Sequence, residues 1–230
     1  MGITRKISIV MVAMLLVAFW AGTACARNEA KKVQKAADVL QAIMKIPEKG
    51  IPPALLRDAK AVAIIPGVIK GAFVVGGRHG TGVLSVRKED NTWSDPIFVS
   101  ITGGSVGWQV GATSTDLILV FKELTNVNKL LQGKFTLGAD AGVAAGPVGR
   151  KVEAATDITF KSGILSYSRS RGLFAGLSLE GAALQVDDEA AAAYYGKEVS
   201  AQDIMAGNSG KRVAASNRLR QELSRATEEK

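Results

Sequence analysis

The stretch that decides the fold is "SYSRSRGLFAGLSLEG", residues Ser166–Gly181. From Leu173 to Glu180, leucine or alanine occupies every second position, an alternation typical of a half-buried β-strand. The preceding segment, Ile164–Ser170, also has strand character, with its three serines on one face. Arg171 and Gly172 lie between the two segments, where glycine can adopt a positive φ. The stretch therefore predicts an antiparallel hairpin, and its glycines are not expected to cradle phosphate.

Short apolar or alternating runs of the same kind fill the middle of the chain, separated by turn signals such as Pro66-Gly67 and Gly103-Gly104. Strands at this spacing indicate antiparallel meanders. A further strand is expected at Val152–Phe160. The other expected strands are Ala61–Ile65, Ala72–Gly77, Gly82–Arg87, Pro96–Ile101, Val106–Gly111 and Asp116–Phe121.

The segment Asn28–Ile46 predicts an amphipathic helix, because apolar residues recur at helical spacing until Pro47. Lys31, Lys32 and Lys35 lie near its start. Two interpretations of these lysines remain open. The helix either packs on the core with a solvated basic side, or it lies on a membrane surface.

Shorter helices are expected nearer the C-terminus, at Leu124–Gln132, Asp187–Tyr195 and Ser200–Met205. Ser200 has the side chain of an N-cap. Lys211–Lys230 is a polar, basic helix or tail that either docks weakly or stays loose. The expected fold class is α+β: a mostly antiparallel β-sheet, sandwich or barrel-like, with an N-terminal amphipathic helix and short C-terminal helices.

The N-terminus has the pattern of a signal peptide. Arg5 and Lys6 precede the uncharged apolar run Ile7–Trp20, which is too short to span a membrane. Cleavage after Ala26 would follow the A-x-A site at residues 24–26. Alternatively, Cys25 would be the lipidated first residue of a lipoprotein. The expected organisation is a signal peptide at residues 1–26, a domain at 27–210 and a tail at 211–230. The product is expected outside the cytoplasmic membrane, in the periplasm or at the outer membrane.

The net charge of the chain is +8, and residues 1–26 contribute two of these charges, which leaves +6 for the remainder. An exported basic protein is expected to meet anionic lipid or polysaccharide rather than nucleic acid. The alternative is that the charge only maintains solubility.

The residues of most catalytic and metal sites are scarce. The chain has one histidine, His79, and one cysteine, Cys25, so metal sites built from these residue types are excluded. The glycines at 80 and 82 precede a strand and lack the third glycine of a dinucleotide loop. "GPVGRK", residues 146–151, lacks the P-loop spacing. We expect neither cofactor nor metal, and no enzymatic activity.

Ser166–Gly181 also resembles the signature of the SYLF domain family, which is also called the Ysc84 family. Further stretches are similar to the family's motifs in the same order, across Glu29 to Met205. They are "EAKKVQKAADVL" (29–40), "IPPALLRDAKAVAIIPGVIKGAFVVGGRHGTGVLSVR" (51–87), "WSDPIFVSITGGSVGWQVG" (93–111), "DLILVF" (116–121), "LGADAGVAAGPVGR" (137–150) and "AYYGKEVSAQDIM" (193–205).

The resemblance implies a lipid-binding module that acts through a basic N-terminal segment, here Lys31, Lys32 and Lys35. Arg169 and Arg171 match the signature, and Phe174 is the apolar surface candidate beside them. Eukaryotic members bind phosphoinositides and some fungal members bind actin. An exported bacterial chain is expected to meet neither, so the expected ligand is an anionic membrane surface. The rival hypothesis is a periplasmic structural domain with an envelope protein as its partner.

Overall fold

The computed structural model describes most of the chain, and in residues 72–75, 105–112 and 173–174 it describes the backbone strand only. The predicted signal peptide with Cys25, the predicted strand at 152–160 and the turn residues Arg171 and Gly172 lie outside the described residues. The described ranges are 26–46, 50–133, 135–147, 162–170, 173–174, 179–210 and 214–228.

Two long strands dominate the sheet. β1 spans Ala61–Val86 and β2 spans Ile97–Phe121, and they pair antiparallel from Ala61↔Phe121 to Leu84↔Ile97. The sequence predicted six short strands in this region, because glycine pairs and a Pro-Gly dipeptide usually mark turns. In the structure the same residues lie inside continuous strands, at bends and bulges. Glycine is common at such positions as well as in turns.

The Pro66-Gly67 dipeptide forms a bulge instead of a turn. The register between β1 and β2 shifts between Ile65 and Val68, and Gly67 has a φ of +63°. The side chain of Asp116 accepts a hydrogen bond from the backbone N–H of Gly67 at 3.0 Å. The carboxylate thereby satisfies a backbone donor that the bulge removes from the ladder.

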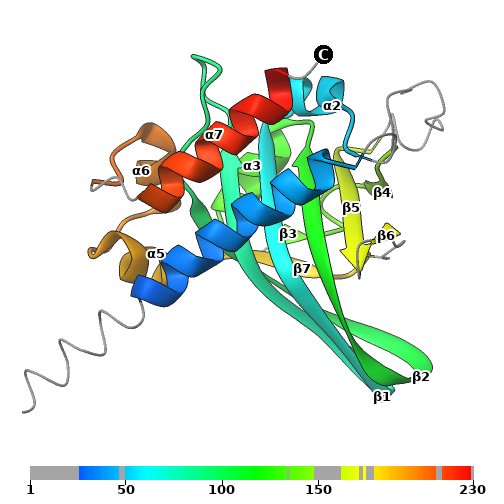
Figure 1. Cartoon of the computed structure of the whole chain (residues 1–230). Coiled ribbons are helices and arrows are strands. Elements are labelled where there is room, and N and C mark those ends of the chain that lie inside the picture. Colours follow the sequence, from blue (N-terminus) through cyan, green and yellow to red (C-terminus); the bar gives the residue numbers. More distant parts are fainter. Residues whose placement is uncertain are drawn as a thin grey trace, which may run out of the picture.

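Both long strands fold back on themselves. A Cβ at Gly82 would overlap the carbonyl oxygen of Ile64, and a Cβ at Gly80 would lie 2.9 Å from a methyl group of Val68. The second half of β1 therefore covers its first half, and the sheet curls. The bent end, residues 69–79 of β1 and 102–114 of β2, is called the arm below. It extends beyond the rest of the molecule, at the lower right of Figure 1.

The remaining strands pair along the free edge of β2 on either side of the arm. β5 (Ile164–Ser170) pairs with Asp116–Phe121, and β7 (Ala183–Val186) pairs with Val99–Thr102. β6 (Leu173–Phe174) pairs antiparallel with β5, which confirms the predicted hairpin next to its turn. Of the rest of the predicted second strand, residues 175–178 lie outside the described residues, and Leu179 and Glu180 are not in a strand. β3 (Phe135–Thr136) pairs with β7. β4 (Val143–Ala145) runs parallel to β5. The sheet is thus mixed but mostly antiparallel, and the predicted α+β class is confirmed.

The predicted helices are present with small shifts of their ends. The N-terminal helix covers residues 26–44. Side-chain caps mark the start of two of the later helices. The Asp187 carboxylate accepts a hydrogen bond from the backbone N–H of Ala190 at the start of α5 (Asp188–Tyr195), and Ser200 forms a capping box with Asp203 at the start of α6 (Ala201–Ala206). The other bounds are α2 Pro53–Asp58, α3 Leu124–Leu131 and α7 Ala214–Glu228.

The N-terminal helix and α7 lie side by side across one face of the sheet (Figure 1). Each helix buries an apolar stripe, which includes Val33 and Leu40 on the first and Leu219 and Leu223 on the second. Of the two outcomes left open for the C-terminal segment, the structure shows the docked one for residues 214–228. The first and last described helices therefore complete one hydrophobic core.

The fold-back of β1 predicts a sharp difference between two glycines of that strand. Gly82→Ala should lower the free energy of unfolding by about 3 kcal/mol, because the added methyl meets backbone that cannot move aside. Gly71→Ala should have little effect, since nothing lies within 4 Å of the position that its added methyl would take. Urea unfolding of both variants checks this, and equal stability of the two would contradict the fold-back.

Candidate membrane-binding surface

The N-terminal helix divides sharply into an apolar and a basic side. Val33, Ala37 and Leu40 are completely buried against the sheet, whereas Lys31 and Lys35 are exposed. The structure therefore agrees with the interpretation in which the apolar stripe belongs to the core. Any membrane contact by this helix would use its charged side, because its apolar side is already occupied.

Both acidic residues of this helix are paired with cations. Glu29 forms an ion pair with Lys32 at 2.5 Å, and the Lys32 ammonium also lies 5.6 Å from the ring centroid of Phe98. Asp38 pairs with Arg218 of α7 at 2.6 Å. Lys32 is consequently held at the protein surface by two partners, which distinguishes it from Lys31 and Lys35.

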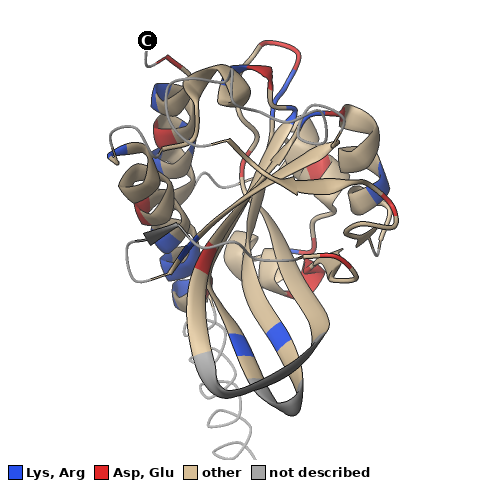
Figure 2. Cartoon of the chain, turned by 90° about the vertical axis from the view of Figure 1, so that its right-hand side faces the viewer, with Lys and Arg blue, Asp and Glu red and all other residues tan. Residues whose placement is uncertain are grey.

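The other four cations of the helix are exposed, and the exposed carboxylate of Asp38 lies on the same helix. Arg27, Lys31, Lys35 and Lys45 are all exposed, and no ion pair joins any of them to another described residue. We call these four residues the basic face. In Figure 2, Lys and Arg recur along the helices on one side of the sheet, while acidic residues there are fewer.

Arg169 lies on a different element and has a structural contact. Its guanidinium is 3.3 Å from the Asp116 carboxylate, the same group that holds the bulge at Gly67. Arg169 therefore neutralises a partly buried acid between β5 and β2. Its pairing partner in β6 is Phe174, of which the structure describes the backbone only, and Arg171 and Cys25 lie outside the described residues. The structure does not bring Arg169 together with the lysines of the helix.

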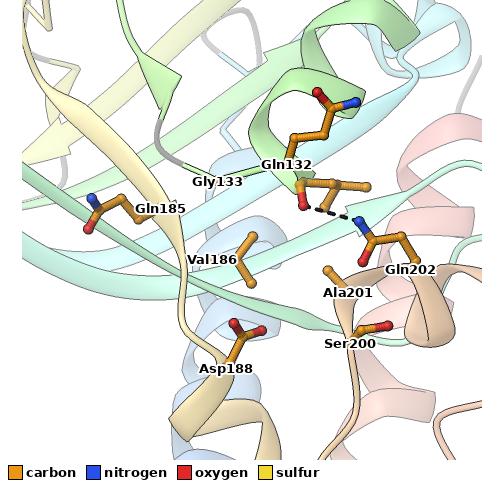
Figure 3. A pocket seen from close by; sticks show the side chains of 9 residues that line it. Gln132, Gly133, Gln185, Val186, Asp188, Ser200, Ala201 and Gln202 are labelled. Atoms are coloured by element: carbon orange, nitrogen blue, oxygen red, sulfur yellow. Dashed lines mark hydrogen bonds between the residues drawn. The ribbon is translucent and has the colours of Figure 1, made fainter.

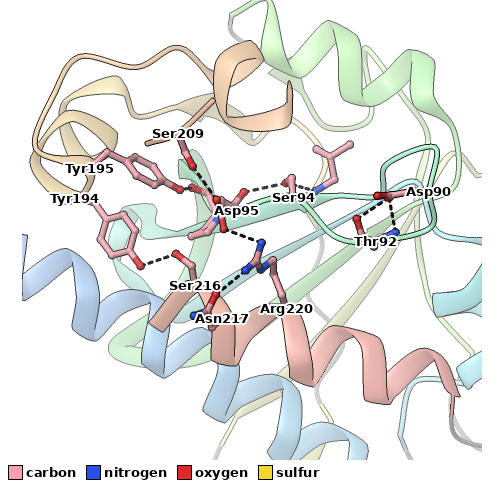
Figure 4. Close-up of polar contacts among 12 residues, drawn as sticks. Asp90, Thr92, Ser94, Asp95, Tyr194, Tyr195, Ser209, Ser216, Asn217 and Arg220 are labelled. Atoms are coloured by element: carbon pink, nitrogen blue, oxygen red, sulfur yellow. Dashed lines mark hydrogen bonds and ion pairs between the residues drawn. The ribbon is translucent and has the colours of Figure 1, made fainter. Parts of the chain in front are cut away.

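A buried polar network links the segment before β2 to the C-terminal helices (Figure 4). The Asp95 carboxylate accepts a hydrogen bond from Ser209 at 2.8 Å and lies 3.4 Å from the guanidinium of Arg220. Tyr195 donates to the carbonyl of Pro96 at 2.8 Å, and the hydroxyls of Tyr194 and Ser216 are also 2.8 Å apart. Sequence analysis missed this network, because its members come from distant parts of the chain and share no motif.

Most members of this network are buried. Its carboxylate and both tyrosines are nearly inaccessible to solvent. Burial raises the pKa of Tyr195, and the nearby negative charge of Asp95 raises it further. The contacts of Asp95 with Arg220 and of Tyr194 with Ser216 hold α7 in position. Among the described residues, no group of three or more potential metal ligands occurs.

The cavity shown in Figure 3 has a volume of about 350 Å³ and lies between the end of α3, β7 and the start of α6. Amide side chains line it, and Gln202 donates to the carbonyl of Leu131 at 3.2 Å. Its carboxylate, Asp188, lies in the first turn of α5, as expected for an acid near a helix N-terminus. The hydroxyl in the lining belongs to Ser200, which donates to the Asp203 carboxylate at 2.6 Å within the capping box of α6.

Within the described residues, no helix is both long enough and apolar enough to cross a membrane. The candidate site described for this α+β domain is the basic face of its N-terminal helix.

Comparison with known proteins identifies the family. Residues 102–226 match the Ysc84 family model, described as "Las17-binding protein actin regulator". Protein YSC84 of Saccharomyces cerevisiae is 36% identical over 189 residues, which cover 79% of this chain and 40% of the yeast protein. The human SH3 domain-containing YSC84-like protein 1 is 34% identical over 187 residues, 79% of this chain and 54% of its own length.

The chain therefore belongs to the Ysc84, or SYLF, family, as its motifs predicted. It spans about 40 to 55% of the length of the curated relatives that it matches. Another yeast relative, 35% identical, is named LAS seventeen-binding protein 3.

The burial of the tyrosines predicts the alkaline behaviour of the protein. All three tyrosines, Tyr167, Tyr194 and Tyr195, are buried, and burial raises the pKa of each above its usual value. The unfolded chain releases these protons near pH 10 and the folded chain does not. The free energy of unfolding should therefore fall as the pH rises above about 10.

Tyrosinate absorbance at about 295 nm should consequently appear together with the loss of the circular dichroism signal. In guanidinium chloride, the same absorbance should appear near pH 10 without a cooperative step. A tyrosine that titrates near pH 10 while the protein remains folded would contradict the packing described above.

Proposed function

We propose that this chain is a non-enzymatic lipid-binding domain of the cell envelope, which associates with anionic membrane surfaces through the basic face of its N-terminal helix. The observation that carries the proposal is the charge separation on that helix. Both of its acids are paired, while Lys31 and Lys35 remain exposed. The net charge of +6 outside residues 1–26 supports the same preference for anionic partners.

The contact is electrostatic in this proposal. Each lysine near an anionic leaflet contributes about 1 kcal/mol, so Lys31 and Lys35 together contribute about 2 kcal/mol. Salt screens such contacts over about a Debye length, so attachment weakens as the ionic strength rises. Firm anchoring needs a second element, either an apolar group or an acyl chain.

Cys25 is the candidate for attachment of such an acyl chain. Whether Cys25 is lipidated or the chain is cleaved after Ala26, we propose that the protein is exported to the periplasm or the outer membrane. If Cys25 is lipidated, the intact mass of the protein extracted from membranes should correspond to residues 25–230 plus the lipid. If the signal peptide is simply cleaved, the mass should be that of residues 27–230. A mass that retains residues 1–24 would contradict both forms of the proposal.

Charge reversal on the helix tests the lipid proposal. Lys31→Glu with Lys35→Glu should weaken binding to phosphatidylglycerol-containing vesicles at low salt by about thirtyfold, because at least about 2 kcal/mol of attraction is lost. Co-sedimentation over a series of lipid concentrations measures this. The matched control is Lys60→Glu with Lys129→Glu, since both lysines are exposed and the total charge changes equally.

The control variant should retain most of its affinity. Equal loss in both variants would indicate nonspecific attraction to the whole protein, and unchanged binding of the Lys31 and Lys35 variant would overturn the proposed site.

A second candidate is a protein-interaction domain, favoured by the relatives that are named for binding the protein Las17. In that case the basic face is a solvated surface and an envelope protein is the partner. Actin is not proposed as a ligand, because we expect the chain to be exported. Affinity capture of a specific envelope protein, with no binding to anionic vesicles, would support this candidate over the first.

A further inference from the structure

An acid lies in the middle of the basic face. Lys31, Asp38 and Lys45 follow one another at intervals of seven residues, which is almost two turns of an α-helix. The helical bonding pattern continues as far as Lys45, whose backbone N–H donates to the carbonyl of Gln41. The three residues therefore lie in one row along the helix, and all three are exposed. A membrane that meets the two lysines also meets the carboxylate between them.

The partner of this acid comes from another helix. Lys35 lies three residues before Asp38, a spacing at which neighbours on a helix can form an ion pair. The Asp38 carboxylate instead accepts a hydrogen bond from the Arg218 guanidinium of α7, with 2.6 Å between Nη2 and Oδ1. The C-terminal helix therefore supplies the charge that offsets the acid of the basic face.

The contact between Asp38 and Arg218 is open to solvent. The side chain of Asp38 is 59% exposed and that of Arg218 is 41% exposed. Ion pairs at such positions contribute little to the free energy of unfolding, because water screens both charges. The pair is therefore only a weak contribution to the docking of α7 on the sheet.

Other contacts hold α7 in place. Leu219 and Leu223 are buried in the hydrophobic core, and Ser216 and Arg220 belong to the buried polar network. These contacts do not involve Arg218. Removal of the Arg218 side chain should leave α7 docked, so an effect on ligand binding can be separated from an effect on folding.

The position of the pair gives it an electrostatic effect on an anionic ligand. Lys31 and Lys35 lie about 10 Å and about 5 Å from Asp38 along the helix axis. Neither separation exceeds about one Debye length at 0.1 M salt, so an unpaired carboxylate at this position would repel the lipid phosphates that the lysines attract. With Arg218 beside it, the charge of the carboxylate is offset, and the surface retains the net charge of its four cations.

We infer that Arg218 completes the lipid-binding surface: it offsets Asp38 at the centre of the basic face, and the docked α7 thereby becomes part of the site that binds anionic lipid. This inference rests on the proposed function and adds a second helix to it. Arg218 acts through Asp38, so the effect of removing the arginine should disappear when the carboxylate is removed as well.

Vesicle binding by single and double variants of the full chain tests the inference. Arg218→Ala should weaken binding to phosphatidylglycerol-containing vesicles at low salt about fivefold, as expected for one charge near an anionic surface. Asp38→Asn should strengthen binding by a similar factor. The double variant, Asp38→Asn with Arg218→Ala, should bind as the unchanged chain does, because the acid and its partner are removed together. Co-sedimentation over a series of lipid concentrations measures all four proteins.

Two charges at α3 provide the matched controls. Lys129→Ala removes an exposed cation, and Glu123→Gln removes an exposed acid but keeps an oxygen that can accept the hydrogen bond from Asn126. In Figure 1, α3 lies behind the sheet, whereas the N-terminal helix and α7 lie in front of it. Each control should change binding less than about twofold, because the charge lies far from the bound surface. Equal effects at α3 and at the pair would mean that the vesicles respond only to the net charge, which would contradict the inference.

Hydrogen exchange shows whether α7 stays docked. The backbone amides of residues 214–228 should exchange as slowly in Arg218→Ala as in the unchanged chain, since the buried contacts of α7 remain. If Arg218→Ala loses this protection, the test moves to Asp38→Asn, which keeps every buried contact of α7. Binding by Asp38→Asn that is no tighter than that of the unchanged chain would then overturn the inference.

The outcomes separate this inference from the proposed function. If Lys31→Glu with Lys35→Glu weakens vesicle binding but Arg218→Ala binds normally with α7 docked, the inference is wrong and the proposed function stands. If the double variant binds as weakly as Arg218→Ala alone, Arg218 does not act through Asp38 and the inference is again wrong. If the unchanged chain does not bind the vesicles, or the lysine variant binds them normally, the proposed function fails and the inference fails with it.

Discussion

The pairing of β1 with β2 is the constraint on which the rest of the structure depends. One edge of β2 is occupied by β1 over nearly its whole length, and its other edge accepts β7 in the first half and β5 in the second. The fold-back at Gly82 brings these halves together, because only a residue without a side chain allows the backbone at Ile64 to approach so closely. The curled sheet then offers one continuous surface to the helices.

The N-terminal helix shows how one segment can serve both the core and a surface. Its buried stripe cannot leave the sheet without exposing a large part of the hydrophobic core, so the helix differs from segments that fold only on a membrane. Its charged side is correspondingly preorganised. Pairing of Glu29 and Asp38 with Lys32 and Arg218 partly offsets the negative charge of the two acids on this helix.

Much of this architecture could be predicted from local patterns, and the exceptions have physical causes. Caps such as Ser200 and Asp187 locate helices because they act within one turn. The continuity of the long strands could not be predicted, because glycine and proline mark turns and bulges alike. The ion pair of Lys32 with Glu29 has the spacing of neighbours on a helix and was within reach of sequence analysis. The contact of Asp95 with Arg220 was not, because only the tertiary fold joins them.

The neighbourhood of the N-terminal helix and α7 has a consequence for the order of folding. Asp38 and Arg218 are 180 positions apart in the chain, yet their helices share one face of the sheet. Contacts of such high sequence separation form slowly, because the loop between them must close first. The hydrophobic core therefore cannot be completed until almost the whole chain has been synthesised. For a protein that we propose is exported, this delay would keep the chain unfolded long enough to be threaded through a translocation channel.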